Sequence, residues 1–137
     1  IYIYIYMKNS RKYLVKKLDQ VFSIYIRQKY ADKNGYVECF TCQRVYHWKK
    51  IQCGHFQSRK YYSTRWLEDN CKPQCYSCNV MKYGEQFIFG RRLDQIYGEK
   101  TAEKLLFMSK ETKKFNNFEL QEMIEKYKAL NESSATS

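Results

Sequence analysis

The sequence predicts an α+β fold in which helices flank a central segment of short strands, and two observations indicate this class. Apolar residues repeat at helical spacing near both ends of the 137-residue chain, over residues 10–31 and again over residues 116–130. Between them, residues 36–53 are rich in β-branched and aromatic residues, which favour strands, and cysteines interrupt this stretch. The length supports one domain with a modest core.

The sequence indicates some helix boundaries more clearly than others. The first should end near Gly35, which suits a positive φ. Asn116 and Glu119 have the spacing of a capping box, so the last helix should begin there. Short helices are expected over residues 93–97 and 102–108, and another from Cys75 onward. Residues 57–74 look irregular.

Four of the six cysteines form two CxxC steps, Cys39–Cys42 and Cys75–Cys78, with 32 residues between them. Each step turns two sulfurs toward one point, so the four thiolates can complete the tetrahedral shell of a structural Zn²⁺ ion. A redox dithiol, or disulfides in a secreted protein, is the alternative. The paired spacing and the lack of an evident signal peptide favour zinc in a reducing cytoplasm.

The two remaining cysteines are assigned differently. Cys53 could replace one of the four ligands. Cys71 is expected to be a packed or half-exposed residue and not a ligand.

The formal net charge of +11 is unevenly distributed. Residues 1–42 carry +5, residues 43–92 carry +7 and residues 93–137 carry −1. This asymmetry indicates a phosphate backbone as the partner. An anionic membrane surface is the weaker alternative, and no apolar run approaches the roughly 20 residues needed to span a bilayer. A basic surface kept for solubility would explain the total but not the asymmetry.

A four-thiolate zinc site leaves no position for water, so hydrolytic chemistry needs another group, and His55 is the candidate. Imidazole titrates near neutrality and can take a proton from water. A histidine without a special role is the alternative reading. The chain has two histidines, and His47, beside Trp48, is expected to pack or to contact nucleic acid.

An ordered set of residues now resembles a known family. Cys39-x2-Cys42, Gly54-His55-Phe56, Asn70 and Cys75-x2-Cys78-Asn79 are similar to zinc-stabilised HNH, or ββα-metal, nucleases. More narrowly, about residues 12–130 resemble the NinG/Rap recombination nucleases of lambdoid phages. The resemblance implies a small zinc-stabilised ββα-metal (HNH-like) core with flanking N- and C-terminal helices. In it, a hairpin bearing His55 packs on a helix that starts near Cys75.

The resemblance also implies roles for these residues. His55 would be the general base, Asn70 would hold its loop, and Asn79 would bind a catalytic Mg²⁺ or Mn²⁺ ion. Arg59 and Arg65 would clamp the phosphate, and three further basic residues of the positively charged segment are expected to contact DNA: Lys60, Lys72 and Lys82. Many HNH enzymes carry a metal-binding Asp or His directly before the base, where this chain has Gly54. The missing ligand would come from Asp69, Glu68, Glu85 or water.

The implied function is a metal-dependent endonuclease that cleaves D-loops or Holliday junctions during phage recombination, in the cytoplasm of an infected or lysogenic bacterial host. Paired incisions in a four-way junction would favour a homodimer. The alternative is a zinc-finger module that binds DNA without cleaving it; a transcription factor is less favoured, because no recognition helix is evident. The aromatic residues Tyr61, Tyr62 and Trp66 would stack on unpaired bases or pack beneath the loop.

The sequence is accordingly divided into five segments. Residues 1–9 form an N-terminal extension that is disordered or not native, and residues 10–35 carry the first helix. Residues 36–92 form the zinc-bound HNH-like core. Residues 93–131 form a C-terminal helical region, and residues 132–137 form a flexible tail.

Overall fold

The computed structural model describes residues 10–136, which fall into two units. One unit combines the chain up to residue 25 with the chain from residue 114 onward, and the other comprises residues 26–113. Helix α2 (Arg11–Lys29) begins in the first unit and ends in the second. The predicted extension over residues 1–9 lies outside the described residues.

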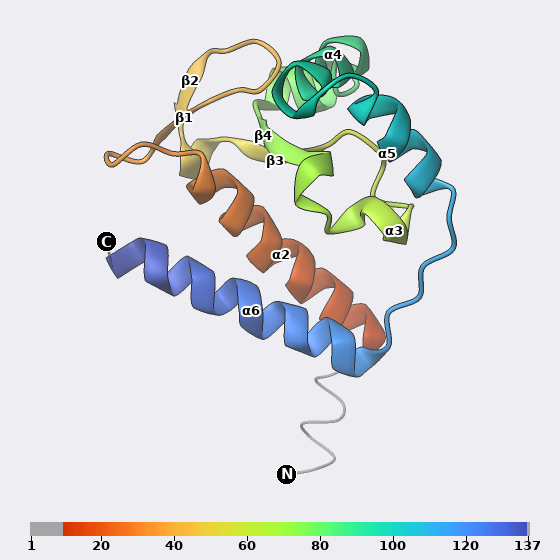
Figure 1. Cartoon of the computed structure of the whole chain (residues 1–137). Coiled ribbons are helices and arrows are strands. Elements are labelled where there is room, and N and C mark those ends of the chain that lie inside the picture. The colour runs from red at the N-terminus through yellow and green to blue at the C-terminus, as the bar shows by residue number, and fades with distance from the viewer. Residues whose placement is uncertain (1–9, 137) are drawn as a thin grey trace. The chain divides into compact units, whose positions relative to one another are not determined.

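The first unit is a pair of helices. The first part of α2 and helix α6 (Asn117–Thr136) run side by side in the same direction (Figure 1). Phe22 packs edge-on against Tyr127, with 5.0 Å between the ring centroids. At the start of α6, the backbone N–H of Glu119 donates to Asn116 Oδ1 at 2.8 Å, and the N–H of Asn116 donates to Glu119 Oε1 at 3.1 Å. Both terminal helices and the capping box are confirmed.

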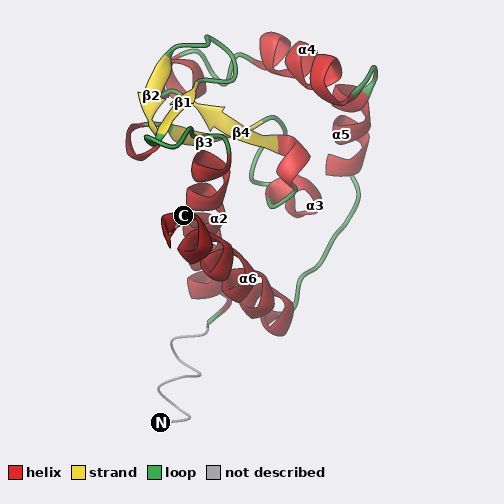
Figure 2. Ribbon diagram, turned by 60° about the vertical axis from the view of Figure 1, so that its left-hand side comes forward, coloured by secondary structure: helices red, strands yellow, loops and turns green. Residues whose placement is uncertain are grey.

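The second unit contains two separate two-stranded antiparallel sheets, drawn in yellow in Figure 2. Strands β1 (Tyr36–Glu38) and β2 (Val45–His47) form the first sheet, and the first CxxC step lies between them. Strands β3 (Gln52–His55) and β4 (Cys71–Gln74) form the second, with His55 directly opposite Cys71. The strands expected within residues 36–53 are therefore present, and β1 and β2 form a hairpin that carries the first CxxC step.

Strand β4 lies in a segment that the sequence predicts to be irregular, and this prediction is wrong at residues 71–74. The strand signal is weak because a lysine, a proline and a glutamine occupy three of its four positions. A proline is tolerated in β4 because, within residues 10–136, that strand pairs with β3 alone and is therefore an edge strand. The rest of the segment holds helix α3 (Tyr62–Arg65) and a 3-10 turn over Glu68–Asn70.

The helical part after β4 also differs from expectation. The stretch after Cys75 forms one π-helical turn, Ser77–Met81, and Gly84 follows with a φ of +88°. Helix α4 (Gln86–Tyr97) starts earlier than predicted, and helix α5 (Thr101–Ser109) covers the expected residues. Their buried side chains form a core with the first CxxC loop: Phe40, Phe89, Leu93 and Leu105. Within residues 10–136, no helix has the length and apolarity needed to cross a membrane.

Candidate metal centre and active site

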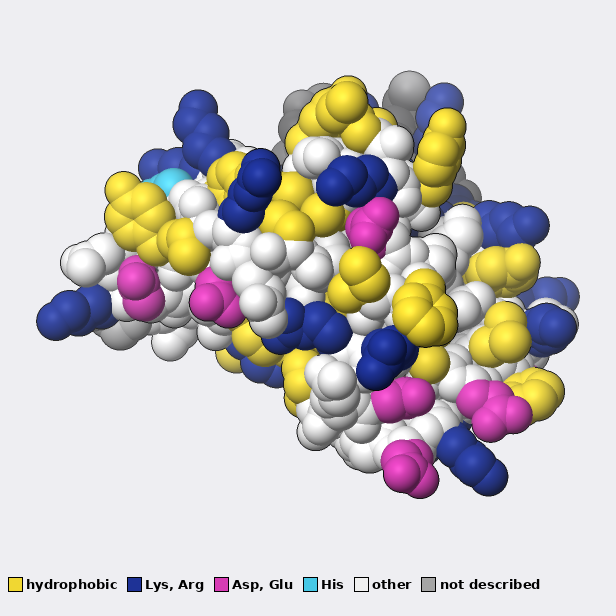
Figure 3. Space-filling view, turned by 90° about the horizontal axis from the view of Figure 1, so that it is seen from above, with side chains coloured by type: hydrophobic (Ala, Val, Ile, Leu, Met, Phe, Trp, Pro, Cys, Tyr) yellow, Lys and Arg dark blue, Asp and Glu magenta, His cyan; other side chains and the backbone are white. Residues whose placement is uncertain are grey.

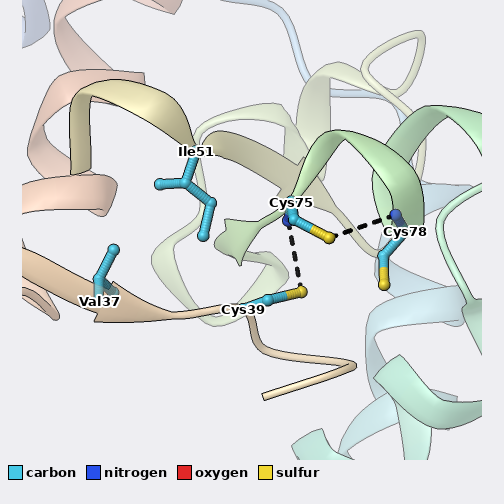
Figure 4. Close-up of a cluster of buried hydrophobic side chains, with 5 residues drawn as sticks. All are labelled: Val37, Cys39, Ile51, Cys75 and Cys78. Carbon is cyan, nitrogen blue, oxygen red and sulfur yellow. Dashed lines mark hydrogen bonds between the residues drawn. The ribbon is translucent and has the colours of Figure 1, made fainter. Parts of the chain in front are cut away.

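The four cysteines of the two CxxC steps come together at one point. The sulfurs of Cys39, Cys42, Cys75 and Cys78 all lie within 4.8 Å of one another. The sulfurs of Cys42 and Cys75 are 3.8 Å apart. A tetrahedron with zinc–sulfur bonds of about 2.3 Å has edges of about 3.8 Å, so this spacing suits a zinc ion. Figure 4 shows three of these side chains beside Val37 and Ile51, with which they form a buried cluster.

The protonation of these thiols also fits a metal centre. Burial alone would raise the pKa of Cys39, but hydrogen bonds from the backbone N–H groups of Cys75 and Cys42 and from Thr41 lower it to about 6. The Cys75 N–H lies 3.3 Å from Cys39 Sγ. Burial raises the pKa of Cys78 to about 12. A bound cation would favour the thiolate form of all four cysteines, so the predicted ligands form a cluster that can hold Zn²⁺.

His55 is the last residue of β3, and its ring orientation is set by a backbone carbonyl. Its Nε2 atom lies 2.9 Å from the carbonyl oxygen of Arg65. Because a carbonyl oxygen only accepts hydrogen bonds, Nε2 carries the proton and the lone pair of the neutral ring is on Nδ1. His55 is half-buried, so the ring is held by the protein while still reaching the surface. This is the arrangement that a general base requires.

Asn70 ties the loop after His55 to the start of β4. Its side chain is fully buried. The backbone N–H of Gln57 donates to Asn70 Oδ1 at 2.8 Å, and Asn70 Nδ2 donates to the carbonyl oxygens of Gln57 and Thr64, both at 3.0 Å. Both ends of the amide are therefore used in fixing the connection between β3 and β4.

Replacing Asn70 with aspartate is expected to lower the free energy of unfolding by about 3 kcal/mol, because the change removes two donated bonds and sets a carboxylate against two buried carbonyl oxygens. Urea unfolding of the zinc-loaded protein measures the effect. Asn116→Asp is the matched control, since aspartate is an equally good helix cap and should change stability little. Equal stability of the two variants would contradict the role given to Asn70.

His55 belongs to a second group of side chains that could hold a metal ion. The donor atoms of Cys53, His55 and Cys71 lie within 4.8 Å of one another. Cys53 thus belongs to this group and does not replace a ligand of the four-cysteine cluster. Cys71 is fully buried, in agreement with its predicted packing. Burial raises the pKa of the Cys71 thiol well above its usual value, and the neighbouring Cys53 raises it further.

Gly54, which stands where many HNH enzymes have a metal ligand, has no room for a side chain. A Cβ atom on Gly54 would lie 2.2 Å from Gln74 Oε1 and 2.9 Å from Gln74 Cβ. Gln74 is fixed in this position because its Nε2 donates to the carbonyl oxygen of Gly84 at 2.8 Å and to Thr41 Oγ1 at 3.2 Å. The glycine is therefore required by packing, which no sequence motif revealed.

Asn79 lies near the other face of β3. Its Nδ2 donates to Gln52 Oε1 at 2.7 Å. Side chains alternate along a strand, so Gln52 points away from the face that carries Cys53 and His55. The Asn79 amide thus contacts the Gln52 side chain, on the face of β3 opposite His55.

Three of the five basic residues predicted to contact DNA are exposed: Arg59, Lys60 and Lys82. Arg65 is half-buried, and its guanidinium donates to the carbonyl oxygen of Arg59 at 2.7 Å. On the face drawn in Figure 3, Lys and Arg side chains are interspersed with hydrophobic ones and do not form one continuous patch.

The burial of Lys72 contradicts its predicted contact with DNA. Its side chain is 1% exposed, and its ammonium group donates to the hydroxyls of Tyr30 and Tyr97 and to the carbonyl oxygen of Glu68. A lysine enclosed in this way is a structural residue of the core. Trp66 is buried as well, which favours the packing role over stacking on bases.

Comparison with known proteins identifies one family. The family model described as "Bacteriophage Lambda NinG protein" matches residues 6–135, which is nearly the whole chain. No curated protein matches the chain. No solved structure matches it either.

Proposed function

The chain belongs to the bacteriophage lambda NinG family, and from this premise we propose that it is an endonuclease that cleaves branched DNA during phage recombination. Family membership suggests the role in recombination. The observation that best supports the nuclease proposal is the orientation of the His55 ring, whose Nε2 lies 2.9 Å from the Arg65 carbonyl oxygen. This contact leaves the lone pair of the neutral ring on Nδ1, the atom that would take a proton from water.

In the proposed reaction, His55 Nδ1 accepts a proton from a water molecule as its oxygen attacks the phosphodiester. The Nε2–H bond to Arg65 keeps the ring in place and stabilises the imidazolium that forms. The P–O3′ bond breaks and the leaving O3′ takes a proton from solvent, so the products carry 5′-phosphate and 3′-hydroxyl ends. Asn70 acts as a positioning residue, because it fixes the connection that supplies the Arg65 carbonyl.

A catalytic Mg²⁺ or Mn²⁺ ion is implied by the family resemblance, but the donors gathered at His55 do not fit it. Hard cations prefer oxygen ligands, whereas the partners of His55 in its cluster are two sulfurs. Of the acidic residues suggested to complete the shell, Glu68 forms an ion pair with Lys29 at 2.8 Å, and Asp69 is exposed. The proposed reaction uses no such ion, and the cleavage assay tests whether one is required.

DNA binding is proposed to involve the connection that follows β3. Arg59 and Lys60 are exposed there, and Arg65 ends helix α3 and supplies the carbonyl that holds His55. Cations on this segment would bring the phosphate backbone to the general base. Lys82, directly after the π-helical turn, is a further exposed cation.

The nuclease proposal is tested by incubating the zinc-loaded protein with a labelled four-way junction and with a linear duplex of the same sequence. Mg²⁺ or Mn²⁺ is added to parallel reactions. We expect incisions near the branch point, and DNA ligase should be able to reseal the resulting ends. Binding without cleavage under every divalent ion would support the non-catalytic DNA-binding module instead. Equal cleavage of junction and duplex would contradict the preference for branched DNA.

Affinity for DNA should fall steeply with salt, and Lys60→Ala should make this dependence shallower. Each phosphate contact contributes a slope of about −0.9 in a plot of log K against log salt for duplex DNA. Loss of the Lys60 contact should reduce the slope by about that amount, measured by fluorescence anisotropy. Lys126→Ala, in the C-terminal segment with a net charge of −1, is the control and should leave the slope unchanged. Identical slopes for the two variants would exclude Lys60 as a phosphate contact.

A further inference from the structure

The cluster around His55 is built by the register of the second sheet. His55 pairs directly with Cys71 across β3 and β4, and Cys53 precedes His55 by two positions on the same face of β3. Two sulfurs and one imidazole nitrogen are thereby brought within 4.8 Å of one another. Neither the proposed hydrolysis nor the four-cysteine cluster uses the two sulfurs.

This donor set has the chemistry of a site for a soft divalent ion. Thiolate and imidazole are preferred ligands of Zn²⁺, and three protein ligands leave a fourth position for water. A histidine that binds a metal usually donates its other N–H to a carbonyl or carboxylate oxygen. Here the Arg65 carbonyl oxygen lies 2.9 Å from His55 Nε2, which directs Nδ1 to any ion. The same oxygen lies 3.7 Å from Cys71 Sγ, so one carbonyl contacts the His55 ring and one of the two sulfurs.

The exposure of the three residues suits an exchangeable ion. Cys71 is fully buried, whereas Cys53 and His55 are half-buried and reach the surface. Three of the four cysteines of the other cluster are at most 3% exposed. A site with three protein ligands and an open side should therefore release its ion more readily than the closed four-cysteine cluster.

We propose that Cys53, His55 Nδ1 and Cys71 form a second site, specific for a thiophilic divalent ion such as Zn²⁺. An ion in this site uses the Nδ1 lone pair, so His55 cannot then accept a proton from water. Zn²⁺ at this site consequently inhibits cleavage while the four-cysteine cluster stays loaded. The existence of the site stands on the cluster alone, and only the inhibition rests on the proposed function.

Metal titration tests the site without any activity measurement. Protein with zinc in the four-cysteine cluster and none in the second site is kept reduced and titrated with Co²⁺. The visible absorption of Co²⁺ reports tetrahedral thiolate ligation. We expect one further ion per chain in the unsubstituted protein and loss of this binding in Cys53→Ser and in Cys71→Ser. His47→Ala, which changes the other histidine, should bind the ion normally.

Native mass spectrometry of the unsubstituted protein at saturating Zn²⁺ gives a second measurement that needs no variant. We expect two zinc ions per chain. One zinc ion per chain, or unchanged Co²⁺ binding in folded Cys53→Ser and Cys71→Ser, would overturn the proposed site.

Inhibition is measured as the Zn²⁺ concentration that halves junction cleavage, relative to each protein's own rate without added Zn²⁺. We expect this concentration to rise at least about tenfold in Cys53→Ser, as for other losses of metal-site interactions. An unchanged value would overturn the inhibitory role. Two bound ions with no cleavage under any condition would refute the nuclease proposal and keep the site. Cleavage by a chain that binds one zinc ion would refute the second metal site and keep the nuclease proposal.

Discussion

Cys39→Ser is expected to abolish cooperative unfolding of residues 26–113 and to remove the zinc ion from the four-cysteine cluster. Cys39 is fully buried and lies in a cluster with Val37 and Ile51, so the ligand and the core are lost together. Apparent zinc-binding energies of roughly 10–16 kcal/mol are as large as the whole stability of a small domain, about 5–15 kcal/mol. Zinc content and urea unfolding followed by circular dichroism measure the effect.

Two controls separate the metal from the side chain. A strong chelator should reproduce the loss in the unsubstituted protein, and added Zn²⁺ should reverse it. Cys53→Ser should keep cooperative unfolding, because Cys53 lies outside the four-cysteine cluster. A Cys39→Ser protein that unfolds at the same urea concentration as the unsubstituted chain would show that the cluster does not stabilise the fold.

His55→Ala is expected to lower the single-turnover rate of junction cleavage by about 10²- to 10⁴-fold, the usual contribution of a general base. Affinity for the junction should stay the same, since the imidazole acts on water and the basic side chains bind the phosphates. Cleavage is followed on denaturing gels with the enzyme in excess, and the dissociation constant is measured separately by anisotropy.

His47→Ala is the matched control for this prediction. His47 lies at the end of β2, where its Nδ1 accepts a hydrogen bond from the Lys49 N–H at 3.2 Å. Its loss removes a local cap and leaves the surroundings of His55 intact, so cleavage should be unaffected. A similar loss of rate in both variants would indicate a general effect on folding, and full activity in His55→Ala would exclude it as the base.

Local signals in the sequence were sufficient for the helices and for the four-cysteine cluster. The capping pair Asn116 and Glu119 and the CxxC steps act over three residues or fewer, and neighbouring residues determine their geometry. The pairing of the two CxxC steps was also predictable, because few arrangements other than a shared ion satisfy four thiols. The roles expected for His55, Asn70 and Asn79 came from the family resemblance. The hydrogen bonds of Asn70 are those expected of a residue that fixes a loop.

Features that depend on contacts distant in sequence were not predictable. Lys72 looks like a surface cation, but Tyr30 and Tyr97, which are 42 and 25 positions away, enclose its ammonium group. The absence of a side chain at Gly54 is explained by Gln74 only once β3 and β4 are paired. The Cys53 and Cys71 group likewise depends on the register of β4, a strand with little strand-forming character. The Cys53-x-His55 alternation was the one signal that could have indicated it.

A crystal structure with a four-way junction carrying a non-cleavable linkage would test whether His55 activates water beside a purely structural zinc cluster. We expect a phosphate at the end of β3, with a water molecule about 2.6–3.2 Å from His55 Nδ1 and in line for attack. The zinc of Cys39, Cys42, Cys75 and Cys78 should have four sulfur ligands and no bound water. A phosphate bound away from His55 would exclude His55 as the base, and a water molecule on that zinc ion would show that the zinc is not purely structural.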